Sequence, residues 1–586
     1  ADAVLKHCRD PLQRMPIHNI RIGIGIAQSK WADATDYALD VLAEEYEIEL
    51  PSRPSLAAVV ADLARLRWEL RRTPIERLRN LPPMADPHIE AAMSLLMKTA
   101  TNAYWASPNL VPLIGFTMVR QTVRHGTTGL SAYGYALYGL VLSSALFDAN
   151  GGDRYGRLAM DTLDRTGARH LYGKTALIAL GFIRQGVAPM AECGNSVLDA
   201  YHEAHAAGDI ENAAYCAMAA MYTAVVAGEQ LDQLDERFAP YVDAVGRSGH
   251  AQTIYGTNVW VQAVANLRAD AVQPELVGDH IDFEPELQRL QAEEDGNAIP
   301  QGVCAAGFLA FLLDDHERAE RHLGLLFSNM RNTPGQAYLM PCLGLYGALL
   351  VRKRSIGTAT TVDRGRLAAI VTLLTRRAQT NAADHQPFLD LIAAEKSAAA
   401  GREDAVERFL DAASTAAASG FTYVEGLALE RASEEYDRRG RHDLARHVLS
   451  RAVAAWRRYG ATARLRLLGH DAAAEARVDT AAGSIDVDTL LDTAAAVSEE
   501  IEVDRVVARV LELALENAGA RRALLARTDE TGSGLIVQAM AELGDDGVVE
   551  VGGVHDDEEP AWARTVGEYV VRTGQDLVVG DAVGDP

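Results

Sequence analysis

The sequence has few cysteines and a shortage of positive charge. Its five cysteines stand far apart with no Cys-x-x-Cys pair, so it offers neither a zinc-ligand set nor a disulfide framework, and it suits a reducing compartment. Lysine and arginine number 56 against 81 acidic residues, which gives a net charge of −25. Because an acidic surface repels phosphates, this composition argues against binding to nucleic acids or to anionic membranes.

Long apolar runs and catalytic signatures are also lacking. The most apolar window, 132–147, is shorter than the roughly 20 residues that a membrane span needs. We therefore predict a buried helix there, and a cytoplasmic chain with no membrane span. No Gly-x-Ser-x-Gly elbow and no His-Glu-x-x-His zinc pattern occurs. We predict no catalytic, cofactor-binding or metal-binding residue in this chain.

A repeat of 39 residues organises the stretch 401–460. A shift by 39 positions places Gly401 on Gly440 and Leu410 on Leu449, and it preserves the apolar pattern between them. The stretch therefore predicts helices separated by glycine turns. A period near 40 is typical of a solenoid of helical hairpins, in which each hairpin buries its apolar faces by stacking on its neighbours.

Helical segments and short polar turns fill the chain before this repeat. Two of the turns supply N-caps, namely Ser55, and Asp86 with Pro87 at the first helical position. Two stretches are polar enough to predict loops. The acidic stretch 270–297 is expected to be a long connection, and the basic stretch 351–366 an exposed link.

Aromatic residues at helix spacing allow two interpretations. Such residues form the core between stacked helices more often than they line a groove, but a solenoid can bind partners on its concave face. The residues concerned are Tyr133, Tyr135, Tyr138, Tyr215, Tyr222, Trp260, Phe308, Phe311 and Trp456. Three histidine pairs lack the spacing of metal ligands and are predicted to lie at the surface: His202 and His205, His316 and His322, His442 and His447.

The segment 168–175, ARHLYGKT, matches a loose phosphate-loop pattern. A phosphate loop needs glycines that expose backbone N–H groups, and it needs a preceding strand. Here the interior residues are large, and the preceding sequence predicts a helix. We therefore predict a turn between helices with Lys174 exposed at a helix start. An ATP-dependent enzyme acting through Lys174 is kept as an alternative.

The pattern changes towards the C-terminus. Leu490, Ala494, Val497 and Ile501 follow a 4-3-4 spacing, which is a short heptad seam. This seam pairs helices either across a homodimer or within one chain, and both interpretations stay open.

Beyond the seam the period becomes that of strands. Strand patterns occupy 521–528, 534–542 and 547–553, a helix pattern follows at 560–574, and a last strand pattern lies at 575–581. The order predicts part of an α+β sensor-type domain.

Several stretches resemble one family. SIDVDTLLDTAAAVSEEIEVDRVVARVLELALENAGARRALL resembles the junction that enters the GAF domain of very large bacterial signalling proteins. LPSRPSLAAVVADL, SAYGYALYGLVLSSALFD and AWRRYGATARLRLL resemble their helical-repeat region. Members of this family combine a Ser/Thr-kinase-like domain, an AAA/STAND-type ATPase, TPR-like repeats, a GAF domain and an output that is often a sensor histidine kinase. The resemblance implies that ATP and magnesium bind domains outside this chain, which we expect to be a piece of a longer protein.

These observations predict a mostly α chain in three regions: a TPR-like helical-hairpin solenoid at 1–483, a connecting signalling helix at 484–503, and the N-terminal part of a GAF-like domain at 504–586. The predicted function is a regulatory protein-interaction and signal-relay segment that couples an ATPase to a GAF-containing sensor and output. Its partners are expected to be proteins or neighbouring domains, and the full-length protein a kinase or ATPase. A transcriptional activator with an ATPase and repeats is a further alternative, against which the GAF-like junction argues.

Overall fold

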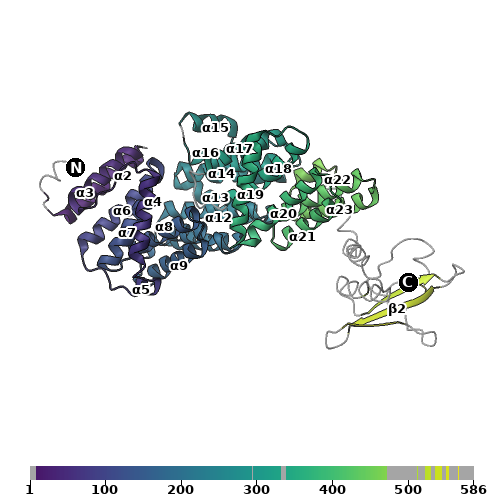
Figure 1. Ribbon diagram of the computed structural model, residues 1–586, viewed down its shortest axis with the longest axis horizontal. Coiled ribbons are helices and arrows are strands. Elements are labelled where there is room, and N and C mark those ends of the chain that lie inside the picture. The colour runs from purple at the N-terminus through teal and green to yellow at the C-terminus, as the bar shows by residue number, and fades with distance from the viewer. Residues whose placement is uncertain are drawn as a thin grey trace. The chain divides into compact units, whose positions relative to one another are not determined.

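A computed structural model describes two compact units, Ala1–Ala472 and Ala473–Pro586. The described residues are Cys8, 10–28, 30–293, 295–330, 338–470, Leu511, 522–528, 535–543, 549–553 and Thr565. The regular elements of the first unit are helices (Figure 1), and the described strands belong to the second. The prediction of a mostly α chain is confirmed.

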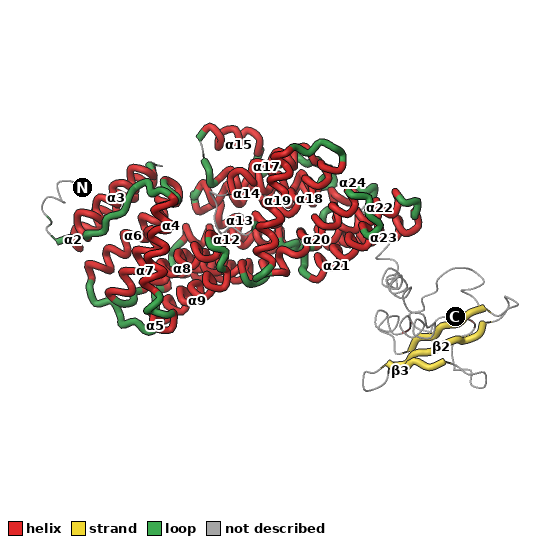
Figure 2. Tube along the Cα trace, viewed as in Figure 1, coloured by secondary structure: helices red, strands yellow, loops and turns green. Residues whose placement is uncertain are grey.

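Mostly short connections join the helices of the first unit (Figure 2), and a longer one spans 269–282. The first are α2 (Pro11–Ala27), α3 (Trp31–Tyr46), α4 (Leu56–Leu70), α5 (Ile75–Arg79), α6 (Pro87–Ala106), α7 (Leu110–His125), α8 (Gly129–Ala145), α9 (Ala149–Thr166) and α10 (Tyr172–Ala176). A 3-10 turn, Arg169–Leu171, precedes α10, and a π-helical stretch, Leu177–Ile183, follows it.

The remaining helices continue the same pattern to residue 467. They are α11 (Met190–Ala206), α12 (Ile210–Val226), α13 (Leu231–Ser248), α14 (Ala251–Arg268), α15 (Phe283–Ala292), α16 (Ala298–Leu312), α17 (His316–Asn329), α18 (Leu339–Ser355), α19 (Thr361–Ala378), α20 (Ala382–Ala399), α21 (Ala405–Ala418), α22 (Thr422–Arg438), α23 (His442–Tyr459) and α24 (Thr462–Leu467). From α6 onward nearly all successive helices pack on each other, so this part of the unit is a stack of helical hairpins.

Both predicted N-caps are present. The Ser55 hydroxyl accepts a hydrogen bond from the Ala58 N–H (3.2 Å) at the start of α4. The Asp86 carboxylate accepts one from the His88 N–H (2.9 Å), and Pro87 is the first residue of α6. Each bond satisfies an amide that has no partner within its helix.

The 39-residue repeat forms the predicted helices and glycine turns. Gly401, Gly420, Gly440 and Gly460 flank α21, α22 and α23, and their φ angles lie between +64° and +86°. Glycine adopts this left-handed conformation without the steric penalty of a side chain, which explains its recurrence at each helix end.

Two large hydrophobic clusters form most of the core of the first unit, one within residues 15–183 and the other within 176–465. A small third cluster joins Ala214, Ala217 and Val245. Helix α8 is buried along most of its length, as predicted for 132–147. Gly152 of α9 lies against α8, because a Cβ atom there would meet the carbonyl oxygen of Gly139 at 2.8 Å. None of the helices in the described ranges combines the length and apolarity that crossing a membrane requires.

Two predictions of extended loops need correction. The long connection predicted at 270–297 is present only at 270–282, because α15 follows and buries Phe283. The exposed link predicted at 351–366 is wrong, because α18 and α19 occupy most of that stretch. Some of the charged residues in these stretches pair with charges on neighbouring helices. For example, the Lys353 ammonium lies 3.2 Å from the Asp363 carboxylate.

Three antiparallel strands are described in the second unit. They are β1 (Arg522–Thr528), β2 (Leu535–Leu543) and β3 (Val549–Gly553), in the order β1-β2-β3. The three strands predicted from the sequence differ from these bounds by no more than two residues. Apart from Leu511 and Thr565, the predicted helices at 484–520 and 560–574 and the strand at 575–581 lie outside the described residues.

Candidate functional site

The segment 168–175 lacks the geometry of a phosphate loop. It follows α9 rather than a strand, and it consists of a 3-10 turn and the start of α10. A Cβ atom at Gly173 would meet the Cβ atom of Ala204 at 2.5 Å, so α11 covers the backbone at this glycine. The backbone N–H groups of a phosphate loop must instead face the ligand.

Lys174 is partly buried, so the prediction of an exposed side chain is wrong. Its ammonium group donates a hydrogen bond to the Thr101 hydroxyl of α6 (3.0 Å) and lies 5.9 Å from the ring centre of Tyr133 in α8. Burial lowers the pKa of Lys174, although Asp209 and Glu211 oppose the shift. The side chain points inward because α10 packs against α8 and α12.

His316 and His322 depart from their predicted surface positions, whereas His202, His205 and His442 are exposed as predicted. The His322 side chain of α17 is 1% exposed, and burial, followed by Arg321 and Arg318, lowers its pKa to about 3. The His316 ring accepts a hydrogen bond from Arg352 (3.2 Å). In the part of the chain that the structure describes, no group of three His, Cys, Asp or Glu residues is placed to hold a metal ion.

The aromatic residues belong to the core. Eight of the nine candidates are buried, and the ninth, Tyr215, is partly buried and donates to Gln252 (3.1 Å). The ring centres of Trp260 and Phe308 are 5.9 Å apart, and Phe308 meets Tyr423 edge to face at 5.1 Å. Of the two interpretations, the core is confirmed.

Two cysteines meet inside this core. The sulfur atoms of Cys304 in α16 and Cys342 in α18 lie 3.0 Å apart, and neither residue is exposed. Burial raises the pKa of the Cys304 thiol, and the neighbouring Cys342 adds to the shift. Their sequence separation of 38 residues is close to the repeat period, and this is the signal that could have found the pair.

The end of the hairpin stack contacts its own middle. At the start of α20, the Asn381 amide donates to the carbonyl oxygens of Gln185 and Ala188 (2.9 Å each). The neighbouring Asp384 carboxylate accepts a hydrogen bond from the Met190 N–H (3.1 Å). These bonds join α20 to the turn that precedes α11.

Further contacts repeat this arrangement along both segments. The Tyr423 hydroxyl of α22 donates to the Val226 carbonyl oxygen (2.9 Å), and Arg466 of α24 pairs with Asp270 (3.1 Å). The sequence separations in both sets lie between 193 and 197 residues. Because five periods of 39 residues are about 195, the chain returns to itself after about five hairpins. We call these contacts of 380–384, 420–423 and 459–466 with 185–190, 225–232, 270 and 312–314 the closing interface.

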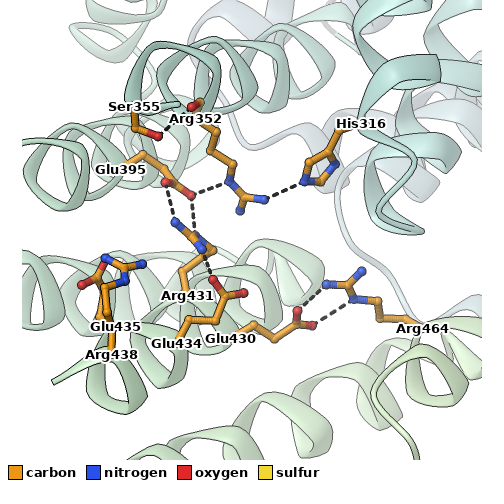
Figure 3. A network of polar contacts seen from close by, with 10 residues as sticks. All are labelled: His316, Arg352, Ser355, Glu395, Glu430, Arg431, Glu434, Glu435, Arg438 and Arg464. Atoms are coloured by element: carbon orange, nitrogen blue, oxygen red, sulfur yellow. Dashed lines mark hydrogen bonds and ion pairs between the residues drawn. The ribbon is translucent and has the colours of Figure 1, made fainter. Parts of the chain in front are cut away.

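A buried charged network lies beside the closing interface (Figure 3). The Glu395 carboxylate of α20 accepts hydrogen bonds from Arg352 of α18 (2.8 Å) and Arg431 of α22 (2.9 and 3.1 Å). Although burial alone would raise it, the two arginines hold the pKa of Glu395 below its ordinary value. One carboxylate therefore joins helices of three successive hairpins.

A second buried pair belongs to the closing interface itself. The Arg464 guanidinium of α24 donates to Glu430 of α22 (3.0 Å) and contacts the Asp314 carboxylate (2.7 Å) and the Leu312 carbonyl oxygen (3.1 Å). Burial raises the pKa of Glu430, and Arg464 and Trp456 oppose the shift. This arginine ties the last described helix of the first unit to the turn between α16 and α17.

The predicted helix-pairing seam of Leu490, Ala494, Val497 and Ile501 lies outside the described residues. A comparison with protein-family models finds no match to this chain, and a comparison with curated proteins finds no relative. The functional argument therefore rests on the geometry of the chain itself.

Proposed function

We propose that this chain is the regulatory protein-interaction and signal-relay segment of a multidomain bacterial signalling protein. In this proposal, residues 1–483 are a TPR-like solenoid, 504–586 belong to a GAF-like sensor domain, and 484–503 connect the two. The stacked hairpins and the antiparallel strands of the second unit are compatible with this assignment. The relay is supported by one observation, the closing interface.

The closing interface shortens the route along the hairpin stack. In an open stack each hairpin contacts only its neighbours, so a change in packing at α11 would reach α24 through every hairpin between them. Here α20, α22 and α24 contact the turns that flank α11, α12 and α14 directly. A partner that binds the middle hairpins would therefore directly change the packing of the helices that precede the second unit.

The free energy of the contacts in the closing interface determines which movement of α22–α24 a signal can cause. Each hydrogen bond of the interface contributes about 0.5–1.5 kcal/mol, and each buried aromatic side chain, such as Phe421 or Tyr423, about 1.5–3 kcal/mol. A ligand must prefer one state by about 5.5 kcal/mol to invert a 1:99 population. We therefore expect a signal to shift α22–α24 as a packed group rather than to detach them.

Gly228 offers a direct test of this relay. Its φ is +86°, and a Cβ atom there would meet the Gly420 carbonyl oxygen at 2.7 Å and the Thr422 nitrogen at 2.9 Å. Gly228→Ala should therefore loosen the closing interface. Hydrogen exchange measured by mass spectrometry on the whole chain should become faster in 420–423 and 462–468, and the exchange of β1 and β2 should change with it.

Gly208 supplies the matched control. Its φ is +80°, but a Cβ atom there would meet nothing within 4 Å. Gly208→Ala introduces the same backbone strain without the clash, so it should leave exchange in 420–468 unchanged. If Gly228→Ala loosens α22–α24 while exchange of the β-strands stays the same, the hairpin stack is a scaffold and the relay is wrong.

A further inference from the structure

Helix α4 has an uncovered apolar face in the described structure. Leu56, Val60 and Trp68 are 68%, 57% and 66% exposed, and they follow one stripe of the helix at multiples of four residues. The residues that α4 buries, among them Leu63, lie on the adjoining face, where the helix packs on α7. An exposed stripe of large apolar side chains on a helix that is already packed indicates a missing partner.

Small residues accompany the large ones on this face. Ala57, Ala61 and Ala64 are exposed and lie within the same stripe. Small side chains allow a second helix to approach closely, while Trp68 and Leu56 supply ridges that fit between its side chains. The surface therefore suits a helix laid along α4 better than an extended peptide, because it presents side chains and no free backbone edge.

Positive charge surrounds the stripe. The exposed arginines of the segment are Arg53, Arg65, Arg67, Arg71 and Arg72. Of these, Arg65 pairs with Glu69 (3.3 Å), and the Arg71 guanidinium lies 5.1 Å from the ring centre of Trp68. No described carboxylate lies within ion-pair distance of the other arginines. In a chain with a net charge of −25, this segment is a local basic surface.

Apart from the Arg65–Glu69 pair, the carboxylates of α4 do not neutralise this charge. Arg120 of α7 donates to the Asp62 carboxylate (3.0 Å) and to the Glu69 carboxylate (3.1 Å), so both acidic side chains are engaged at the α7 side. The arginines at the outer face are therefore available to acidic groups of a partner.

We propose that the outer face of α4 binds an amphipathic helix whose apolar stripe is flanked by aspartate or glutamate. This names the chemistry of a partner for the protein-interaction role, and it rests on that proposed function. A second copy of the chain fits less well, because a symmetric contact would place arginine against arginine. An anionic membrane fits less well because the acidic remainder of the chain is repelled by it.

The test uses the whole chain and a designed, fluorescein-labelled helical peptide of about 20 residues, with leucines on one face and glutamates beside them. Fluorescence anisotropy should show saturable binding that weakens with added salt. Trp68→Ser with Val60→Ser, and separately Arg67→Glu with Arg72→Glu, should each weaken binding by about tenfold or more. Because these side chains are exposed, the variants should keep the circular dichroism of the parent chain.

Ile356 and Val362, which are 73% and 62% exposed, provide the matched control. Ile356→Ser with Val362→Ser should bind the peptide as the parent does. A peptide with lysines in place of the glutamates should bind at least about tenfold more weakly. The proposal is overturned if the acidic peptide does not bind, or if it binds the Trp68 and Val60 variant equally well.

Two further arms separate the remaining outcomes. In the first, the chain is sedimented with vesicles of phosphatidylcholine and phosphatidylglycerol. If the chain binds the vesicles through Trp68 but does not bind the peptide, the face is a membrane contact and the proposal of a helical partner is overturned. Gly228→Ala should leave peptide binding unchanged, since α4 takes no part in the closing interface. A failed relay and a failed α4 surface are therefore distinguishable.

Discussion

The Arg464 and Glu430 side chains form an ion pair in which they are only 3% and 7% exposed. Burial of one charge alone is costly, and each of these groups keeps its charge because the other lies beside it. The same arginine contacts the turn between α16 and α17, 152 residues earlier in the sequence. The pair is thus a buried ion pair of the core and also contributes a contact to the closing interface.

Removal of one partner should be strongly destabilising. Arg464→Ala leaves Glu430 buried without its counter-charge, and we expect the free energy of unfolding of the first unit to fall by about 3–5 kcal/mol. The double variant Arg464→Leu with Glu430→Leu should recover most of this loss. Urea denaturation followed by circular dichroism measures both effects.

The exposed pair of Arg446 and Asp443 is the control for this measurement. Its side chains are 80% and 92% exposed, so Arg446→Ala should change the free energy of unfolding by less than about 1 kcal/mol. Equal losses for Arg464→Ala and Arg446→Ala would contradict the role assigned to the buried pair.

In the native chain, one of the five cysteines should react with a thiol reagent and the other four should not. Cys8 is partly exposed, whereas the others are buried. Burial also raises the pKa of Cys193 to about 12, which suppresses its reactive thiolate. In the native chain we expect an aromatic disulfide reagent to release its chromophore rapidly at Cys8 alone, and at all five sites in denaturant. Rapid reaction in the native Cys8→Ser variant would show that the core opens readily.

Local features of the fold were predictable from the sequence. The glycine turns at Gly420 and Gly440 follow from a requirement for the left-handed conformation, and the caps at Ser55 and Asp86 follow from unsatisfied amides at helix starts. Strand bounds in the second unit follow from a period of two. Each of these depends on a few neighbouring residues.

The closing interface depends on geometry that no local pattern contains. Asn381 and Tyr423 look like ordinary helix-end and core residues until the stack has returned after about five hairpins. The sequence predicts Lys174 at the surface because it begins a helix after a turn, and it predicts His322 there because the histidine pairs lack the spacing of metal ligands. The packing of neighbouring hairpins buries both instead.

His385 should make the first unit sensitive to acid. The side chain of this α20 residue is 1% exposed, and burial, followed by Arg377, lowers its pKa from 6.5 to about 3. Below pH 6.5 the unfolded chain binds a proton that the folded chain does not bind until about pH 3. The stability contributed by the neutral ring is therefore complete above pH 6.5 and is lost as the pH falls, by up to about 1.4 kcal/mol per pH unit.

Replacement of this histidine should remove that dependence. Between pH 8 and pH 5, His385→Leu should lose about 2 kcal/mol less stability than the parent chain. The neighbouring Asp384, whose pKa burial raises to about 6, works in the opposite direction in both chains and does not affect the difference. His442→Leu, at a side chain that is 70% exposed, should lose stability as the parent does. Parallel losses in all three chains would contradict a neutral, buried His385.

Lys174 distinguishes a structural lysine from a nucleotide-binding one. Its hydrogen bond to Thr101 and the coverage of Gly173 by α11 predict that titration calorimetry with ATP and magnesium will show no heat that Lys174→Met removes. The same substitution places a flexible apolar side chain in a partly buried position where the lysine has a lowered pKa. We therefore expect it to change the free energy of unfolding by less than about 1.5 kcal/mol. Micromolar ATP binding that disappears in Lys174→Met would instead support the enzyme alternative. In that case the lysine, which packs against Thr101 and Tyr133, would have to turn outward to reach a phosphate.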